Sequence, residues 1–242
     1  MKQKITLFCL HFAGGNKYSY RALFQNLPSF ITQVPIEAPG RGSRLREDLI
    51  DDIEKMTEDF YQQIKLRLGI TPYAIYGHSM GALLAYLLTH KIKNNNHSLP
   101  VQLFLSGTPG PSSAKRQEKM RHLMDKEGFL NEIRALGGMP MEILDDKEML
   151  EYFEPILRKD FKVSENYTHV ENAPLPIPFT VLTGTNEDME EDDISLWQKE
   201  SGEPVDFIKF EGDHFFIYNH TNEIVKIISN KLNFYAKALN YE

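Results

Sequence analysis

Six short runs of apolar and β-branched residues recur along the chain, with helix-like segments between most of them. The runs are Ile5–Phe12, Thr32–Ile36, Tyr73–Tyr76, Val101–Ser106, Phe179–Thr183 and Val205–Phe210. Several are apolar at nearly every position, which is typical of parallel strands buried on both faces. The alternation predicts an α/β fold with a mostly parallel central sheet and helices on both of its faces.

Three segments between or after these runs carry apolar residues every three or four positions, the spacing of one helix face. They are Ile53–Leu68, Leu83–Ile92 and Ile224–Tyr235. The acidic pair Asp51 and Asp52 precedes the first segment, where capping acids are favoured. These segments predict three helices that cover the sheet.

One long segment interrupts the alternation. Residues 111–170 are helix-like with no strand between them, and about sixty residues is too long for an ordinary connection. We interpret the segment as an inserted helical lid within a single domain that spans residues 1–242. Its apolar side chains, among them Met139 and Phe129, either wall a substrate chamber or close the lid's own small core. Both interpretations stay open.

Composition narrows the possible functions. A chain of 242 residues with 41% hydrophobic residues is long enough for one large core. The net charge of −7 argues against binding to nucleic acid, which usually requires a basic face. The apolar run near the N-terminus is too short for a signal peptide and no segment resembles a membrane span, so we expect a cytoplasmic protein with no membrane partner. The single cysteine, Cys9, falls inside an apolar run and is expected to be a small buried residue.

The sequence Gly77-His78-Ser79-Met80-Gly81 follows one predicted strand and precedes a predicted helix. In a nucleophile elbow the serine occupies a strained turn that exposes its hydroxyl, and the glycines avoid collisions with the neighbouring strand and helix. The pattern alone can arise by chance, but the strand–turn–helix context makes Ser79 the expected nucleophile.

A serine hydroxyl needs an imidazole to accept its proton. In α/β-hydrolases the histidine comes last in the chain, after the acid. His214 fits this order, because it follows the run Val205–Phe210 and the turn Glu211-Gly212-Asp213. His220 opens the last helix and is expected to cap it or to face solvent, and His78 is expected to pack beside the nucleophile.

The oxyanion of a tetrahedral intermediate needs at least two N–H donors. The residue after the nucleophile, Met80, supplies the first in this type of fold. The loop His11-Phe12-Ala13-Gly14-Gly15 ends the first predicted strand, and we favour the N–H of Ala13 as the second donor, with that of Phe12 next. The alternative is that the two glycines form an ordinary turn.

Several stretches together resemble the type II thioesterases of nonribosomal peptide and polyketide synthesis, and are similar to the medium-chain thioesterases of fatty-acid synthesis. They are Phe12-Ala13-Gly14-Gly15, Pro39-Gly40-Arg41-Gly42-Ser43-Arg44, Gly77-His78-Ser79-Met80-Gly81, Leu136-Gly137-Gly138-Met139-Pro140, Leu157-Arg158-Lys159-Asp160-Phe161, Glu165-Asn166-Tyr167 and Gly212-Asp213-His214-Phe215-Phe216. The resemblance implies the α/β-hydrolase fold with a mobile lid bordering an acyl chamber.

The same resemblance implies an activity and a partner. Members of this family hydrolyse acyl or aminoacyl groups from the phosphopantetheine arm of carrier proteins, so we expect an acyl-loaded carrier protein as partner, and no metal or organic cofactor. Another ester or amide hydrolase, or an acyltransferase with the same triad, is the nearer alternative. A non-catalytic binding module is the farther one.

The triad acid departs from the family pattern. After the strand the family has Gly-x-x-Asp, whereas here Gly184-Thr185-Asn186 is followed by Glu187 and then Asp188. Spacing favours Glu187 and residue type favours Asp188. We slightly favour Asp188, because a one-residue adjustment in a surface loop is easy.

Basic residues raise two further hypotheses. Arg41 or Arg44 binds a phosphate or, as we favour, pins its loop to a carboxylate. The densest basic cluster lies at the start of the lid, where it either docks an acidic carrier protein or forms a solvated helix face. It consists of Lys115, Arg116, Lys119 and Arg121.

Overall fold

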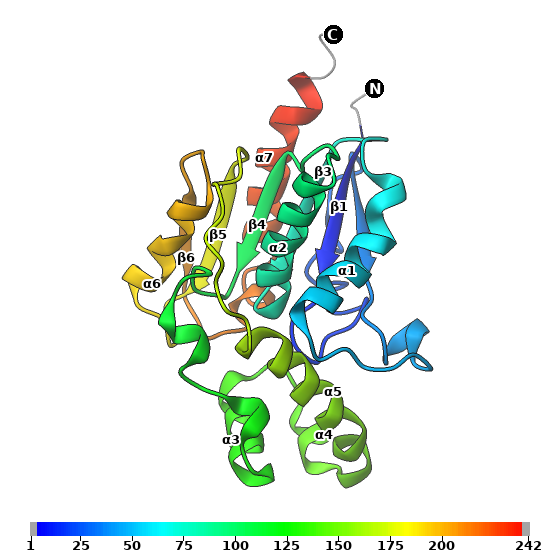
Figure 1. Ribbon diagram of the computed structural model, residues 1–242, viewed down its shortest axis with the longest axis vertical. Helices are drawn as coiled ribbons and strands as arrows, with labels where there is room; N and C mark the ends of the chain where they lie inside the picture. The colour runs from blue at the N-terminus through cyan, green and yellow to red at the C-terminus, as the bar shows by residue number, and fades with distance from the viewer. Residues whose placement is uncertain (1–3, 239–242) are drawn as a thin grey trace.

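A six-stranded sheet, parallel throughout, forms the centre of the molecule (Figure 1). The computed structural model describes residues 4–238. Its strands are β1 (Ile5–Leu10), β2 (Ile31–Ile36), β3 (Tyr73–His78), β4 (Gln102–Ser106), β5 (Phe179–Gly184) and β6 (Asp206–Phe210), in the spatial order β2-β1-β3-β4-β5-β6. Each boundary lies within two residues of the corresponding predicted run, and the predicted fold class is confirmed.

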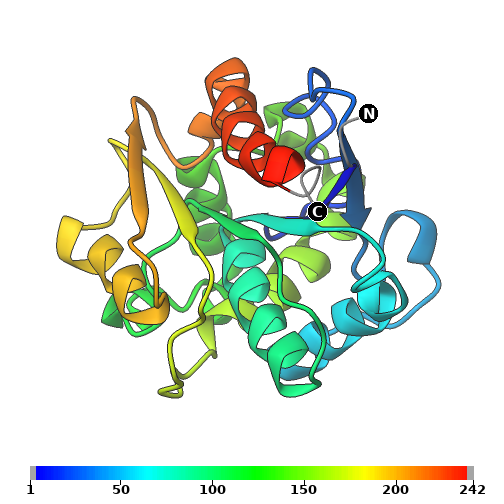
Figure 2. The same ribbon diagram turned by 90° about the horizontal axis from the view of Figure 1, so that it is seen from above.

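Helices cover both faces of the sheet (Figure 2). One face carries α1 (Ile53–Ile64), α2 (Met80–Asn94) and α6 (Glu191–Ser195), and the other carries α7 (Thr221–Ala238). In β1, Phe8 and Leu10 join the first of these cores, whereas Leu7 and Cys9 join the second. Both sides of the strand are therefore buried, which explains why its sequence is apolar without alternation.

Cys9 is buried as expected. Burial raises the pKa of its thiol far above the ordinary value, so the sulfur stays protonated and unreactive.

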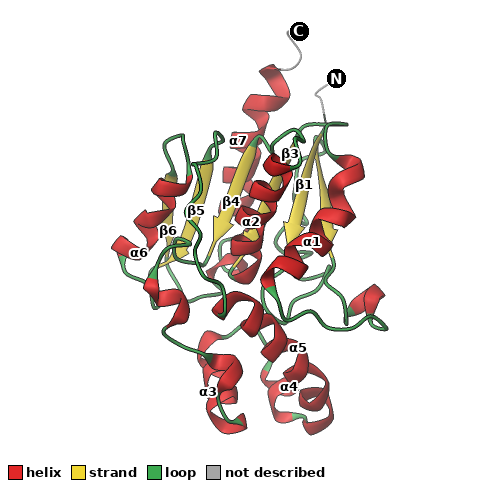
Figure 3. Cartoon of the chain, in the orientation of Figure 1, coloured by secondary structure: helices red, strands yellow, loops and turns green. Residues whose placement is uncertain are grey.

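The segment between β4 and β5 folds as helices and turns beyond the carboxyl ends of the strands (Figure 3). It contains α3 (Lys126–Leu136), α4 (Met141–Asp145) and α5 (Lys147–Glu165). Asp125 and Asp146 accept N–H bonds in the first turns of α3 and α5 and so cap them. A separate small core joins the three helices, and α5 also packs against α1 and α2. The lid therefore covers the edge of the sheet at which β3 turns into α2.

No helix within residues 4–238 combines the length and apolar character needed to cross a membrane.

Candidate active site

Ser79 occupies a sharp turn between β3 and α2, with φ 57° and ψ −120°. This backbone conformation is rare for a residue with a side chain and costs about 1–3 kcal/mol. A Cβ atom on Gly77 would lie 2.1 Å from the carbonyl oxygen of Gly81, and one on Gly81 would lie 2.1 Å from that of Leu10. Both glycines are therefore required by close backbone approach, as expected for a nucleophile elbow.

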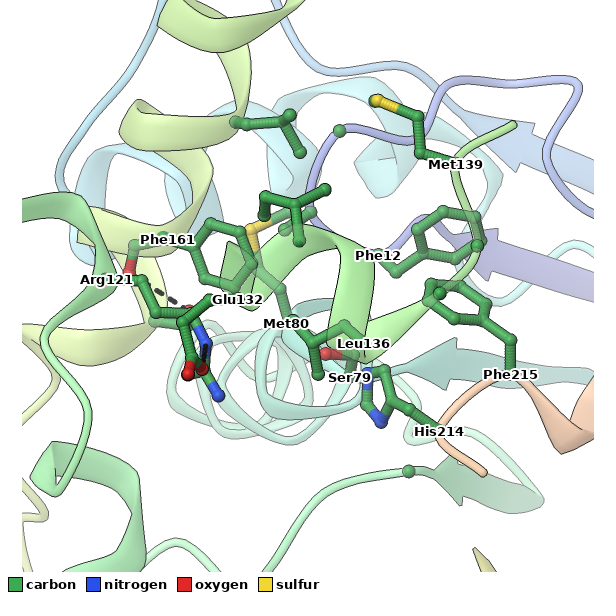
Figure 4. Close-up of a pocket in the computed structure, with 18 of the residues that line it drawn as sticks. Phe12, Ser79, Met80, Arg121, Glu132, Leu136, Met139, Phe161, His214 and Phe215 are labelled. Carbon is green, nitrogen blue, oxygen red and sulfur yellow. Dashed lines mark hydrogen bonds and ion pairs between the residues drawn. The ribbon is translucent and has the colours of Figure 1, made fainter. Parts of the chain in front are cut away.

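His214 lies on the loop after β6, and Figure 4 shows its imidazole next to the Ser79 side chain. Its Nδ1 is 2.6 Å from Oε1 of Glu187, whose other oxygen accepts the N–H of Gly184 at 2.7 Å. The carboxylate accepts from Nδ1, so the proton of the neutral ring belongs on that nitrogen and Nε2 is left as an acceptor toward Ser79. The Glu187 side chain is only 3% exposed.

Asp188 faces the other way, and our preference for it was wrong. Its carboxylate is 67% exposed and pairs with Lys115 at 3.2 Å and Lys119 at 3.4 Å. The hydrogen bond to Gly184 turns the loop so that Glu187 points inward. The longer glutamate side chain reaches His214 from the position at which the family has an aspartate.

Two backbone N–H groups are free to bind an oxyanion. Phe12 accepts the N–H of Gly15 at 2.9 Å and Gly14 has φ +76°, which are features of a type II turn. Within residues 4–238, neither the N–H of Ala13 nor that of Met80 donates a hydrogen bond. Both residues line the same cavity as Ser79, as does Phe12, whose ring packs edge-on against Phe215 at 4.9 Å.

A cavity of about 570 Å³ opens above Ser79 and His214 (Figure 4). The lid supplies most of its apolar wall, and the wall residues include Ile133, Leu136, Met139, Phe153, Leu157 and Phe161. Met139 thus lies in the wall of the cavity, the first of the two positions that the sequence left open for it.

Phe129 does not line this cavity and belongs to the lid's own core, the second of the two interpretations that the sequence left open. Its ring is fully buried in the lid core, edge-on to Phe161 at 6.0 Å and with the Arg158 guanidinium 4.2 Å from its centre. Ile133, Leu157 and Phe161 belong to the same core and also line the cavity, so the lid serves both roles that the sequence left open.

The chain matches the family described as Thioesterase domain over residues 5–232. It belongs to this family. It is 31% identical over 236 residues to the linear gramicidin dehydrogenase LgrE of Brevibacillus parabrevis, a match that covers 96% of this chain and 89% of LgrE.

Solved structures of related proteins are similar to this chain over nearly its whole length. The crystal structure of ClbQ from the colibactin NRPS/PKS pathway has a TM-score of 0.90 and 30% identity, covering 98% of this chain and all of ClbQ. The type II thioesterase BorB from the borrelidin biosynthetic cluster has a TM-score of 0.85 and 28% identity, covering 95% of this chain and 93% of BorB.

The name of LgrE describes a dehydrogenase, but this chain lacks the Gly-x-Gly-x-x-Gly sequence with which many dehydrogenases hold a dinucleotide. Its family and its relatives of known structure make it a thioester hydrolase of the serine hydrolase type.

His78 packs beside the site of this thioesterase, as expected. Its ring lies 4.8 Å from that of His214 and its Nδ1 is 3.0 Å from the Ser106 hydroxyl. Burial and, to a smaller extent, the neighbouring His214 hold the pKa of His78 well below its ordinary value. His78 is therefore a neutral packing residue that supports the His214 ring. The other expected structural histidine, His220, lies with Nε2 2.8 Å from the carbonyl of Glu211.

Most of the basic cluster at the start of the lid is paired with acidic side chains of the same chain. Arg116 is half-buried and donates to the Thr108 hydroxyl and to the carbonyls of Pro109 and Gly110. Lys115 and Lys119 share Asp188, while Arg121 pairs with Glu132 and Glu165. This arrangement ties the lid to the loop of Glu187 and leaves little free charge for docking a partner.

Arg41 and Arg44 pin their loop, as we favoured. Arg41 binds both oxygens of the buried Asp160 on α5, and Arg44 pairs with Asp59 and Glu47. The sequence pattern gave no role to Asp160, which lies 119 residues from Arg41. In the sequence, Asp160 stood out only as part of the stretch Leu157-Arg158-Lys159-Asp160-Phe161, which resembles the family.

Within residues 4–238, no group of three or more His, Cys, Asp or Glu residues is placed to hold a metal ion.

Proposed function

We propose that this protein releases acyl or aminoacyl groups from the phosphopantetheine arm of carrier proteins, using Ser79, His214 and Glu187 as a catalytic triad. The observation that carries the proposal is the pairing of His214 Nδ1 with a buried carboxylate at 2.6 Å, beside a serine at a strained elbow. The similarity to ClbQ from the colibactin NRPS/PKS pathway and to BorB, a type II thioesterase from the borrelidin biosynthetic cluster, supports the choice of substrate.

The proposed reaction has two steps. Ser79 Oγ attacks the thioester carbonyl while its proton passes to Nε2 of His214, and the N–H groups of Met80 and Ala13 bind the oxyanion. Collapse breaks the carbon–sulfur bond, and His214 returns the proton to the departing thiolate. Water then attacks the acyl-serine ester with His214 again as base, releasing a carboxylic acid and free Ser79.

Glu187 keeps the His214 proton on Nδ1 and stabilises the cation that forms when Nε2 accepts a second proton. The apolar cavity under the lid holds the acyl group, and the flexible side chain of Met139 suits acyl groups of several shapes. Removal of wrong or stalled acyl groups would restore the free thiol of the carrier.

The decisive experiment loads a purified carrier protein with acetyl, octanoyl or aminoacyl phosphopantetheine and follows release of the free thiol by mass spectrometry. We expect turnover with the natural chain and a loss of several orders of magnitude with Ser79→Ala, because nucleophile and base act as a unit. Small esters and amine acceptors are assayed in parallel. Faster turnover of these than of the loaded carriers would favour an esterase or acyltransferase. Absence of Ser79 labelling by a fluorophosphonate would favour a non-catalytic binding module.

A further inference from the structure

The turn Phe12–Gly15 is held by side chains that take no direct part in the proposed reaction. The Phe12 carbonyl accepts two hydrogen bonds at 2.9 Å, one from the N–H of Gly15 and one from Nδ1 of His11. A trans peptide group is planar, so its N–H points opposite to its C=O. Holding the Phe12 carbonyl therefore also fixes the direction of the Ala13 N–H.

His11 is suited to this role in only one protonation form. It is 1% exposed, and its Nε2 accepts the N–H of Ala38 at 3.3 Å. With Nε2 as an acceptor, the proton of the neutral ring must lie on Nδ1, where it is donated to Phe12. Burial, with a contribution from the nearby Arg41, lowers the pKa of His11 to about 4, so the neutral ring persists at neutral pH.

The next peptide group of the turn is held from the lid. Gly14 donates its N–H to Oδ2 of Asp160 on α5 at 2.8 Å. Arg41 binds the same carboxylate and also donates to the carbonyl of Gly15 at 3.2 Å. A Cβ atom on Gly14 would lie 2.5 Å from Leu157, so α5 rests directly on the turn.

We propose that His11 is a positioning residue that, by donating from Nδ1 to the Phe12 carbonyl, aims the Ala13 N–H at the oxyanion, while Asp160 holds the following peptide group from the lid. This inference rests on the proposed function, in which Ala13 is an oxyanion donor. Removal of an oxyanion donor costs about 10²–10³ in kcat, and a misdirected donor should cost somewhat less, about 10- to 100-fold.

Two conservative variants separate the two hydrogen bonds of His11. In His11→Asn the amide nitrogen occupies the place of Nδ1 and can still donate to Phe12. In His11→Gln the amide reaches the place of Nε2 and can still accept from Ala38, but Phe12 loses its donor. Each variant keeps one bond and loses one, so a simple loss of stability affects both alike. His90→Leu is a control that removes a buried imidazole ten residues along α2 from Met80, about 15 Å away.

The measurements are kcat and KM on one acyl thioester, the inhibition constant of an acyl trifluoromethyl ketone that forms a tetrahedral adduct with a serine, and the melting temperature. We expect His11→Asn to stay within about threefold of the natural kcat and His11→Gln to lose about 10- to 100-fold, with KM little changed. The inhibition constant should rise in proportion to the loss of kcat.

Equal losses in the two variants, a larger loss in His11→Asn, a change confined to KM, or unfolding of both would overturn the positioning role. Failure of the proposed function itself looks different. In that case the natural chain would turn over small esters or amine acceptors faster than loaded carriers, or Ser79 would not react with a fluorophosphonate, whereas failure of the positioning role alone leaves the natural activity intact.

Discussion

Glu187 and Asp188 are adjacent carboxylates in opposite environments. Glu187 is buried between His214 and the N–H of Gly184, whereas Asp188 is mostly solvated beside two lysines. Lys115, ahead of the smaller contribution of Lys119, holds the pKa of Asp188 below its ordinary value. Only Glu187 is placed to fix the tautomer of the histidine.

The first prediction compares these two acids. Glu187→Gln keeps the shape of the side chain but favours the wrong imidazole tautomer, so kcat should fall by about 10³–10⁴ with little change in KM. Asp188→Asn, the matched control, removes only solvated ion pairs and should cost less than about tenfold. Steady-state kinetics of both variants on one acyl thioester decide the matter. A greater loss of kcat in Asp188→Asn would contradict the assignment.

The sequence predicts Ser79 as nucleophile and His214 as base because the constraints on both are local, and the structure places their side chains next to each other. An elbow needs glycines at fixed offsets from the serine, and the histidine follows a strand. The choice of acid could not be made in the same way, because it depends on which way a loop turns after Gly184. The contact between Arg41 and Asp160 leaves no local pattern at all, since the residues are 119 positions apart.

The two parts of the lid differ in their attachment to the body. Helix α5 is anchored by Asp160 and by Lys159 and Lys162, which both bind Asp51. The turn after α3 rests instead on Phe215, because a Cβ atom on Gly138 would lie 2.2 Å from that ring. This turn therefore closes the cavity by contact rather than by ion pairs.

The second prediction uses the neighbouring glycines of this turn. Gly137 and Gly138 both have positive φ, but a Cβ atom on Gly137 would meet nothing within 4 Å. Phe215 is wedged against Phe12 and Tyr218 and cannot easily move aside. Gly138→Ala should therefore displace the turn and raise KM for an octanoyl thioester about five- to tenfold. Gly137→Ala meets no neighbour and adds only the strain of a backbone conformation that favours glycine (φ 72°, ψ −163°), so its KM should stay within about twofold.

Steady-state kinetics with acetyl and octanoyl thioesters test this prediction, since a displaced wall should affect the longer chain more. An equal rise of KM in both variants would show that backbone conformation, and not contact with Phe215, governs closure.

Strands could be placed from sequence because burial on two faces leaves continuous apolar runs. The sequence could not show in the same way whether a given lid side chain faces the cavity or the lid core. Phe129 and Ile133 are four residues apart, share one face of α3 and both belong to the lid core, yet of the two only Ile133 also lines the cavity. Helical periodicity shows which face is buried, but it does not show which neighbour covers each residue.

Buried neutral histidines make the whole molecule sensitive to acid. Burial lowers the pKa of His11 and of His90 from 6.5 to about 4, and it holds that of His78 well below the ordinary value. Lys93 and His169 also contribute to the lowered pKa of His90. In the unfolded chain each imidazole regains an ordinary pKa near 6.5. Below that pH it therefore binds a proton that it does not bind in the folded state.

The last prediction follows from the sign of this linkage. A lowered folded-state pKa means that, between about pH 6.5 and 4, the unfolded state binds more protons, so the free energy of unfolding must fall as the solution is acidified. Each such histidine adds up to about 1.4 kcal/mol per pH unit to the fall in the free energy of unfolding in this window, and nothing above it.

Carboxylates titrate in the same pH range, so the slope of the unfolding free energy against pH in the natural chain alone does not identify the histidines. His90→Leu isolates one imidazole away from the catalytic residues and should flatten the slope by up to that amount. Urea unfolding of both proteins at pH 7, 6, 5 and 4.5 gives the two curves, and parallel curves would mean that His90 is not kept neutral by burial.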